Sequence, residues 1–359
     1  MLDTILSIIL LILLLSIIVI VHEGGHFIVA KIFGVYCEEF SIGMGPKIFS
    51  KKGKETTFSI RALPIGGFVA MAGEDDDKIE THVTKDLPKE RTLKGIHPVK
   101  KIIIMLAGVT MNFILAIVVV AGILLYNGSY NVSGSATISA VVENSAAYGL
   151  LQDGDTIEKA CVLNEDNCQT FKNYTEFSYF ISAYDGNGPV RFYVDRNGEE
   201  IEVDVTPNYD TSEERYIFGI NYSGYEQVPV NITNCLGYSV DYLWSVTKVI
   251  FNTLKNLLRG VGLSNLSGPV GIYDSTSKAL TEGPIYYFNL LAILSLNIGI
   301  MNLLPLPVLD GGRVLITIIE MIIGKELNEK VSNIIMSISV VLLLLLMLFA
   351  TYQDILRLF

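Results

Sequence analysis

Two histidines four residues apart, His22 and His26, enclose Glu23 in the string His-Glu-Gly-Gly-His. On an α-helix, positions i and i+4 lie on one face, so both imidazoles can bind a single zinc ion at about 2.0–2.1 Å. The glutamate then lies near the same ion, where it can take a proton from zinc-bound water. The string therefore predicts a hydrolytic zinc site.

An uncharged apolar run, Thr4–Val21, leads directly into these residues. Ionisable side chains at membrane depth are costly, so they usually have partners and a function. The alternative is a polar helix end at the membrane surface. We interpret the run as a retained anchor rather than a signal peptide, because it lacks a basic region before it and a small-residue cleavage site after it.

The composition indicates a membrane protein rather than a soluble enzyme. The chain has 359 residues, half of them apolar, and its mean hydropathy is +0.46. A helix needs about 20 apolar residues to cross the hydrocarbon core. Three further uncharged runs reach that length, Ile102–Tyr126, Ile285–Leu309 and Val331–Gln353. With the first run they predict four transmembrane helices.

The charges are distributed unevenly along the chain. Between Lys31 and Lys101 there are 13 basic and 10 acidic residues, whereas between Asn127 and Trp244 there are 5 basic and 18 acidic ones. Because cytoplasmic loops carry the excess of lysine and arginine, the first loop is expected in the cytoplasm. The acidic central region and both termini are then expected outside, with the histidine string near the cytoplasmic face. A net charge of −11 argues against a nucleic-acid partner.

The loop after the first run favours β-structure. Residues 40–46 and 57–69 are β-branched and aromatic and are punctuated by glycine and proline, which indicates short strands and tight turns. Unpaired strand edges cannot face lipid, so this hairpin must pack on protein or line a wet cavity. Its open edge could pair with an extended substrate by strand addition.

The central region, residues 132–207, has the pattern of a small α/β module. Strands are expected at 136–142, 190–194 and 201–205, and a short helix at 177–183. Cys161 and Cys168 fall in this module, either as a disulfide or as two unpaired thiols. Residues 236–258 have helical periodicity interrupted by charges, which favours an amphipathic helix on the outer membrane face over a fifth span.

A catalytic zinc normally has three protein ligands and one open position. His82 and His97 both lie in the cytoplasmic loop, so a carboxylate is the better third candidate. Asp310 ends the third apolar run, within Asn302–Gly312, where two prolines break the helix and paired glycines allow an unusual turn. The alternative for Asp310 is a helix cap.

Taken together, these motifs resemble the site-2 protease family of intramembrane zinc metalloproteases, and most closely its bacterial regulator-of-sigma-E type with a single PDZ-like domain. Five blocks carry the resemblance: His22–His26, Pro64–Phe68, Ala107-Gly108 with Asn112-Phe113, Ser267–Ile272 and Asn302–Gly312. A Leu-x-x-Gly-Asp-x-Ile string at Leu151–Ile157 resembles a PDZ module and is weaker on its own.

The resemblance implies a role for each matched position. His22, His26 and Asp310 would bind Zn²⁺, and Glu23 would be the general base. The substrate would be positioned by Pro64, Gly66, Gly67, Asn302, Pro305 and Pro307. Gly108 and Asn112 would pack close to the active site, although small-residue helix packing explains them equally well. Arg313 stands where many relatives carry histidine and is not expected to touch zinc.

The expected fold is a polytopic α-helical membrane protein with four transmembrane helices, a membrane-associated β-hairpin region and one extracytoplasmic PDZ-like α/β domain. Four segments are expected: helices one and two with the histidine motif and hairpin at 1–126, the PDZ-like domain at 127–210, an amphipathic linker at 211–284, and helices three and four with the Leu-Asp-Gly-Gly motif at 285–359.

The resemblance implies regulated intramembrane proteolysis in the inner or plasma membrane. The substrates would be single-span proteins already cut by another protease, such as an anti-sigma factor or a signal-peptide remnant. One alternative is a non-catalytic PDZ scaffold with a structural metal site. The other is a metal-dependent transporter, which the lack of internal repeats disfavours.

Overall fold

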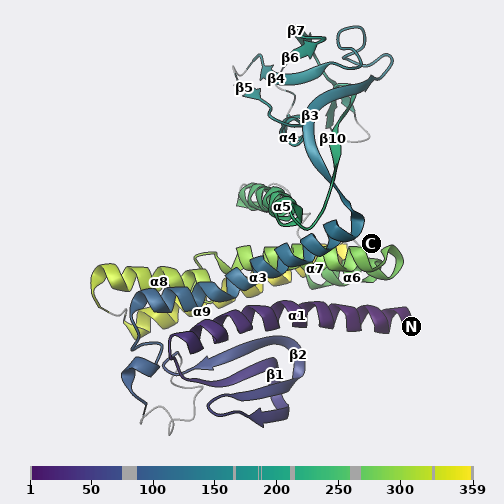
Figure 1. The fold of residues 1–359 in the computed structure, drawn as a ribbon. Coiled ribbons are helices and arrows are strands. Elements are labelled where there is room, and N and C mark those ends of the chain that lie inside the picture. The colour runs from purple at the N-terminus through teal and green to yellow at the C-terminus, as the bar shows by residue number, and fades with distance from the viewer. Residues whose placement is uncertain are drawn as a thin grey trace. The chain divides into compact units, whose positions relative to one another are not determined.

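The computed structural model describes residues 2–74, 87–164, 167–184, 186, 188–210, 215–258, 268–325 and 328–356 (Figure 1). Two compact units divide the chain. The first, which we call the membrane unit, combines Met1–Tyr126 with Ile232–Phe359. The second is Asn127–Asn231, which we call the outer unit after the compartment that its acidic sequence predicts. The histidine motif and Asp310 both belong to the membrane unit.

Four helices among the described residues are long and apolar enough to cross a membrane, at Asp3–Ile32, Pro98–Asn127, Pro284–Asn302 and Ile334–Leu356. They lie in α1 (Leu2–Ile32), α3 (Pro98–Asn127), α7 (Pro284–Asn302) and α9 (Glu329–Leu356). These are the four candidate spans that the sequence predicts. The third ends earlier than its apolar run, because the prolines after it lack a backbone donor.

Three further helices of the membrane unit lie among the described residues, α5 (Cys235–Leu258), α6 (Pro269–Glu282) and α8 (Asp310–Ile323). Helix α5 covers the predicted amphipathic segment. From the sequence we expect Asp310 at the end of the third span, whereas in the structure it opens α8, a separate helix. Asp354 of α9 accepts hydrogen bonds from the backbone N–H groups of Gly268 and Gly271, which ties the start of α6 to α9.

The loop between α1 and α3 forms an antiparallel sheet from β1 (Cys37–Lys52) and β2 (Thr57–Met71), followed by a 3₁₀ turn at Lys89–Arg91. Phe40 pairs with both Val69 and Phe58, so the two long strands fold back into four antiparallel segments. The bends fall at glycines with φ between +82° and +85°, namely Gly43, Gly45 and Gly66. The predicted short strands are thus parts of two long, bent ones.

This sheet packs against α1 in the membrane unit (Figure 1). Phe27 of α1 stands edge-on to Phe40 and Phe58, at 5.4 and 5.8 Å between ring centroids. The segment 67–71 lies at one edge of the sheet, since it pairs with 37–42 only. A Cβ added at Gly67 would lie 3.0 Å from Val19 of α1, so this edge is held directly on the helix.

The outer unit is built on a six-stranded sheet with strand order β10-β3-β4-β6-β7 and with β5 paired to β4. The strands are β3 (Ser129–Val141), β4 (Thr156–Val162), β5 (Asn167–Thr170), β6 (Val190–Arg196), β7 (Glu199–Val205) and β10 (Ile220–Pro229). A small hairpin, β8 (Asn208–Asp210) with β9 (Arg215–Ile217), lies off this sheet. Because β10 pairs with β3, the unit continues past residue 210, the end that the sequence predicts for it.

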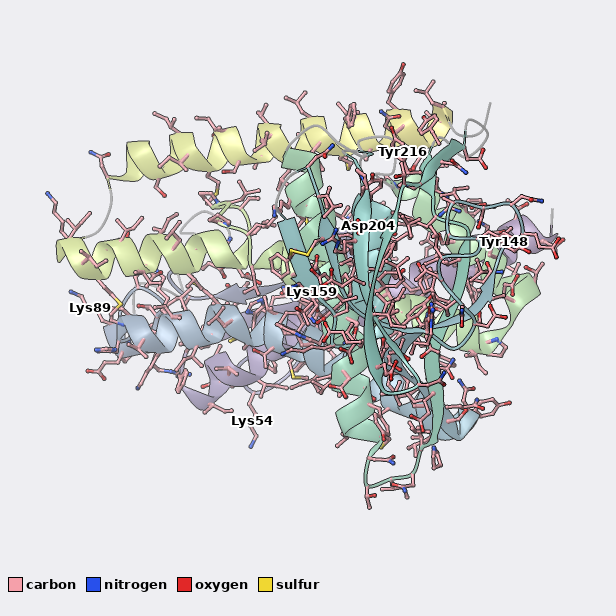
Figure 2. The ribbon with its side chains drawn as sticks, turned by 90° about the horizontal axis from the view of Figure 1, so that it is seen from above. Lys54, Lys89, Tyr148, Lys159, Asp204 and Tyr216 are labelled. Carbon is pink, nitrogen blue, oxygen red and sulfur yellow. A yellow bond between two sulfur atoms is a disulfide. The ribbon has the colours of Figure 1, made fainter. Side chains whose placement is uncertain are left out.

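Its core is apolar and fully enclosed, with the side chains of Phe177 and Phe192 at 0 % exposure. Phe177 comes from α4 (Tyr174–Ala183), which Asn173 caps by accepting the backbone N–H of Glu176. Cys161 and Cys168 form a disulfide between β4 and β5, one of the two options left open by the sequence (Figure 2).

Candidate metal centre

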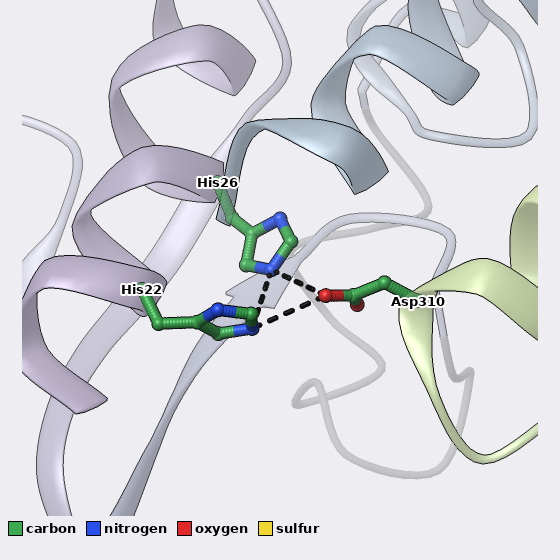
Figure 3. Close-up of side chains that lie close together, drawn as sticks. All are labelled: His22, His26 and Asp310. Atoms are coloured by element: carbon green, nitrogen blue, oxygen red, sulfur yellow. Dashed lines mark hydrogen bonds and ion pairs between the residues drawn. The ribbon is translucent and has the colours of Figure 1, made fainter. Parts of the chain in front are cut away.

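Three side chains from two distant parts of the chain converge in the membrane unit (Figure 3). His22 and His26 come from consecutive turns of α1, and Asp310 comes from the first turn of α8. Oδ2 of Asp310 lies 3.1 Å from Nε2 of His22 and 3.4 Å from Nε2 of His26. The two Nε2 atoms are 3.3 Å apart. The predicted ligand set is therefore brought together.

These separations fit a tetrahedral zinc ion. Bonds of about 2.0–2.1 Å in a tetrahedron place neighbouring ligand atoms about 3.3–3.4 Å apart. Oδ2 of Asp310 is buried and receives no hydrogen bond from any described residue. An anionic oxygen and imidazole nitrogens at this spacing can hold a cation between them, and two imidazoles with one carboxylate are a donor set that suits zinc.

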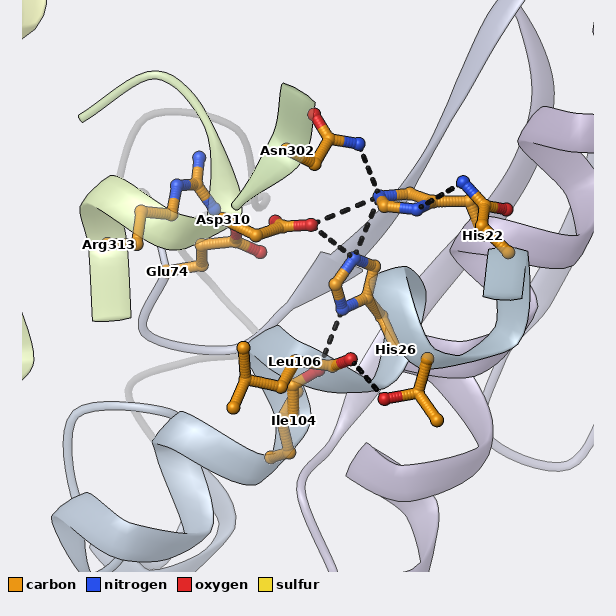
Figure 4. A network of polar contacts seen from close by, with 10 residues as sticks. His22, His26, Glu74, Ile104, Leu106, Asn302, Asp310 and Arg313 are labelled. Carbon is orange, nitrogen blue, oxygen red and sulfur yellow. Dashed lines mark hydrogen bonds and ion pairs between the residues drawn. The ribbon is translucent and has the colours of Figure 1, made fainter. Parts of the chain in front are cut away.

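The imidazole of His26 is fixed in the orientation that a metal ligand needs. Its Nδ1 lies 2.8 Å from the backbone carbonyl oxygen of Ile104 (Figure 4). Because a carbonyl oxygen only accepts, Nδ1 carries the proton, and in the neutral ring Nε2 keeps its lone pair toward Asp310.

Close packing of α1 on α3 makes this contact possible. A Cβ at Gly25 would lie 2.4 Å from the carbonyl oxygen of Ala107, and a Cβ at Gly108 would lie 2.3 Å from Nε2 of His26. Neither position has room for a side chain. The glycine inside the histidine motif and the glycine on α3 therefore let the two helices approach to the distance at which α3 contacts both imidazoles.

The paired glycines after Asp310 have a similar purpose. A Cβ at Gly311 would lie 2.3 Å from the carbonyl oxygen of Leu303, and one at Gly312 would lie 2.1 Å from that of Leu306. The segment after α7 thus folds back directly onto the first turn of α8. This turn connects the end of α7 to Asp310, whose carboxylate points toward α1.

A cavity of about 900 Å³ contains the three ligands together with Glu23 and Asn302. The edge segment of the β-sheet, with Gly66 and Gly67, lines the same cavity. A Cβ at Gly67 would lie 3.5 Å from Cγ of Glu23, so the edge strand and the glutamate are neighbours. The side chain of Asn302 reaches the site, with Nδ2 3.5 Å from Nε2 of His22 (Figure 4).

Two of the prolines predicted to position the substrate lie outside the cavity. Pro305 is exposed and Pro307 is buried beneath α8, and neither lines the cavity. Pro64 is in β2, but its side chain lies outside the described residues, as does His82. His97 precedes α3 and is not part of the metal-binding group found among the described residues.

Two ion pairs between residues that line the cavity were not foreseen. Arg313 of α8 forms an ion pair with Glu74, just after β2 (Figure 4). Glu39 of β1 accepts hydrogen bonds from Arg61, at 2.8 Å, and from Ser59. Burial would raise the pKa of Glu39, but hydrogen bonds from Ser59, Lys47 and Arg61 outweigh it, so the pKa lies below its ordinary value.

Arg61 also connects this group to the sheet edge. Its guanidinium lies 4.9 Å from the ring centroid of Phe68, within the range of cation–π contact. Nothing in the sequence indicated these contacts. Glu39 and Arg61 meet because β1 and β2 bend, and Arg313 is 239 residues away from Glu74 along the chain.

The four candidate spans, the histidine pair and the carboxylate are those of a membrane-embedded zinc metallopeptidase. A family model described as Peptidase family M50 matches residues 10–346, and the chain belongs to this family.

Curated relatives match over nearly the whole chain. The zinc metalloprotease RasP of Geobacillus kaustophilus is 33 % identical over 432 residues, covering 100 % of both chains. The regulator of sigma-W protease RasP of Bacillus subtilis is 31 % identical, covering 95 % of this chain and 96 % of its own. The PDZ domain of the SdrC-like protein of Listeria innocua aligns with 26 % of this chain at 20 % identity and a TM-score of 0.22, too low to carry an argument.

Proposed function

We propose that this protein hydrolyses peptide bonds within transmembrane segments of other membrane proteins, with Zn²⁺ held by His22, His26 and Asp310. The observation that carries the proposal is the spacing of the three donor atoms, 3.1–3.4 Å, inside a cavity that also holds Glu23. The names of the curated relatives, zinc metalloprotease and regulator of sigma-W protease, support the same activity.

Zinc bound at this site would acidify a water molecule and polarise the carbonyl of the bond to be cut. Glu23 then takes the proton of the attacking water and passes it to the leaving amine. The amide of Asn302, next to His22, is placed to donate a hydrogen bond to the substrate backbone. Each of these groups acts from a regular helix or its last turn, so the geometry is held by the fold.

The substrate must be extended before it can be cut, because a transmembrane helix hides its carbonyls in internal hydrogen bonds. The edge segment 67–71 offers backbone groups next to Glu23 with which an unwound stretch can pair. Those new hydrogen bonds offset part of the cost of unwinding. We therefore place the substrate strand between this edge and the metal ligands.

The distribution of charges supports one arrangement relative to the membrane. The excess of basic residues before α3 favours a metal centre near the cytoplasmic face and an acidic outer unit outside. The Cys161–Cys168 disulfide supports an oxidising compartment for the outer unit. There a PDZ-like domain would admit single-span substrates, such as anti-sigma factors or signal-peptide remnants, after another protease has shortened them.

The experiment is cleavage of a single-span substrate by the purified full-length protein in detergent, with zinc content measured on the same samples. Glu23→Gln should keep its zinc and its fold while losing cleavage by at least about 100-fold, since it removes the general base. Glu282→Gln, an exposed glutamate at the end of α6, is the matched control and should cleave normally. Normal cleavage by Glu23→Gln would refute the mechanism.

A further inference from the structure

Helix α3 contacts the metal-binding histidines at three positions one turn apart. The carbonyl of Ile104 receives Nδ1–H of His26 at 2.8 Å. One turn on, Gly108 makes room for both rings, since a Cβ there would lie 2.3 Å from His26 and 2.8 Å from His22. A further turn on, the amide of Asn112 lies 3.3 Å from Nδ1 of His22. One face of α3 therefore contacts both imidazoles.

The amide of Asn112 is completely buried, at 0 % exposure. Its Oδ1 has no hydrogen-bond partner among the described residues, while Nδ2 faces Nδ1 of His22. A histidine that binds a metal through Nε2 carries its proton on Nδ1, which then needs an acceptor. An amide nitrogen cannot accept, but the same amide turned by 180° presents Oδ1 to the ring. That orientation pairs the buried oxygen.

We propose that Oδ1 of Asn112 accepts Nδ1–H of His22 when zinc is bound, and that Asn112 is a positioning residue for this ligand. The inference rests on the proposed function, because it takes His22 as a zinc ligand through Nε2. Asn112 would do for His22 what the carbonyl of Ile104 does for His26. Both contacts hold the proton on Nδ1 and fix the plane of the ring, so that both Nε2 lone pairs meet at one point.

The anchoring of Asn112 fits this role. Its backbone carbonyl accepts a hydrogen bond from the hydroxyl of Ser295 of α7 at 2.9 Å, so this turn of α3 is tied to a second helix. The short side chain has little freedom in a fully buried position. A rigid acceptor costs less conformational entropy on metal binding than a mobile one.

The test measures zinc affinity of the full-length protein in detergent by competition with a chelator of known affinity, independently of cleavage. Asn112→Leu keeps the size of the side chain but can neither donate nor accept, and it should weaken zinc binding by about 10–100-fold. Asn112→Asp can only accept, and it should bind zinc at least as tightly as the unchanged protein. Thr110→Val, on an exposed position of the same helix, is the control and should bind normally.

The outcomes separate the inference from the proposed function. An unchanged affinity in Asn112→Leu would overturn the role of Asn112, and so would an Asn112→Asp protein as weak as Asn112→Leu, because donation or packing would then explain the contact. If Asn112→Leu does not give a monodisperse protein, Asn112→Ala supplies the same comparison without adding volume to the buried site. Failure of the unchanged protein to bind zinc would instead refute the proposed function.

Discussion

Asp155 of the outer unit and Asp310 of the membrane unit both turn carboxylate oxygens away from solvent, but their surroundings are opposite. Asp155 receives two hydrogen bonds of 2.7 Å from the guanidinium of Arg196 and one of 2.9 Å from the backbone N–H of Gln152. Asp310 meets two imidazole nitrogens, and its Oδ2 receives no hydrogen bond from any described residue.

We interpret the difference as that between a carboxylate that stabilises the fold and one that is placed to bind a metal. The charge of Asp155 is balanced within the chain, so its role is complete without a ligand. The charge of Asp310 faces two imidazole nitrogens, and a metal cation bound between these groups would balance it. Burial alone does not identify a functional acid, whereas the identity of the atoms facing it does.

The largest effect is expected at Asp310. Replacing it by alanine removes one of three ligands, so zinc affinity should fall by more than about 100-fold and cleavage should disappear. Zinc content after dialysis and cleavage of the single-span substrate are the measurements. Asp274→Ala, in an exposed ion pair with Lys278 on α6, is the control and should keep both. Full zinc content in Asp310→Ala would remove Asp310 from the ligand set.

In the outer unit, breaking the ion pair between Arg196 and Asp155 should lower the stability of the fold and leave the zinc content unchanged. Arg196→Ala leaves the carboxylate of Asp155, 1 % exposed, without its cation and should cost about 3 kcal/mol. Urea-dependent proteolysis of the full-length protein, monitored by cuts within residues 127–231, measures this cost. A normal urea midpoint would contradict the structural role, and lost zinc would contradict the contrast between the two carboxylates.

A smaller effect should appear with pH. Burial would raise the pKa of Asp155, but hydrogen bonds from Arg196 and Gln152 outweigh it, so the pKa lies below its ordinary value of 3.8. Because the folded pKa is depressed, the stabilisation is present above about pH 4 and is lost as the pH falls toward the folded value. The same proteolysis assay should show a steeper loss below about pH 4 in the unchanged protein than in Arg196→Ala. Equal slopes would contradict the assignment.

The convergence of the two histidines could be predicted from the sequence because the information there was local. His22, Glu23 and His26 lie within five residues on one regular helix, so their common face follows from helical geometry. Asp310, 284 residues after His26, was proposed as the third ligand from its chemistry and its expected depth in the membrane, and its side chain does lie beside both histidines. Its separate helix α8 was missed, because the prolines and glycines before it indicate that one helix ends but not that another begins.

Contacts set by tertiary packing could not be predicted. The pairing of Phe40 with both Val69 and Phe58 depends on where β1 and β2 bend. The resemblance implied that Gly108 packs close to the active site, as it does, but the role of Gly25 in the approach of α1 to α3 is visible only when a Cβ is placed on it. Isolated charges such as Arg196 have several carboxylates within reach along the chain, and only the folded sheet selects one.

The most direct test of the metal centre is the zinc K-edge X-ray absorption spectrum of the purified full-length protein. We expect one zinc ion with two imidazole nitrogens and oxygen ligands at about 2.0–2.1 Å. One imidazole should disappear in His22→Ala. A sulfur shell at about 2.3 Å would contradict this ligand set by moving the zinc to a cysteine, and so would a spectrum unchanged by His22→Ala.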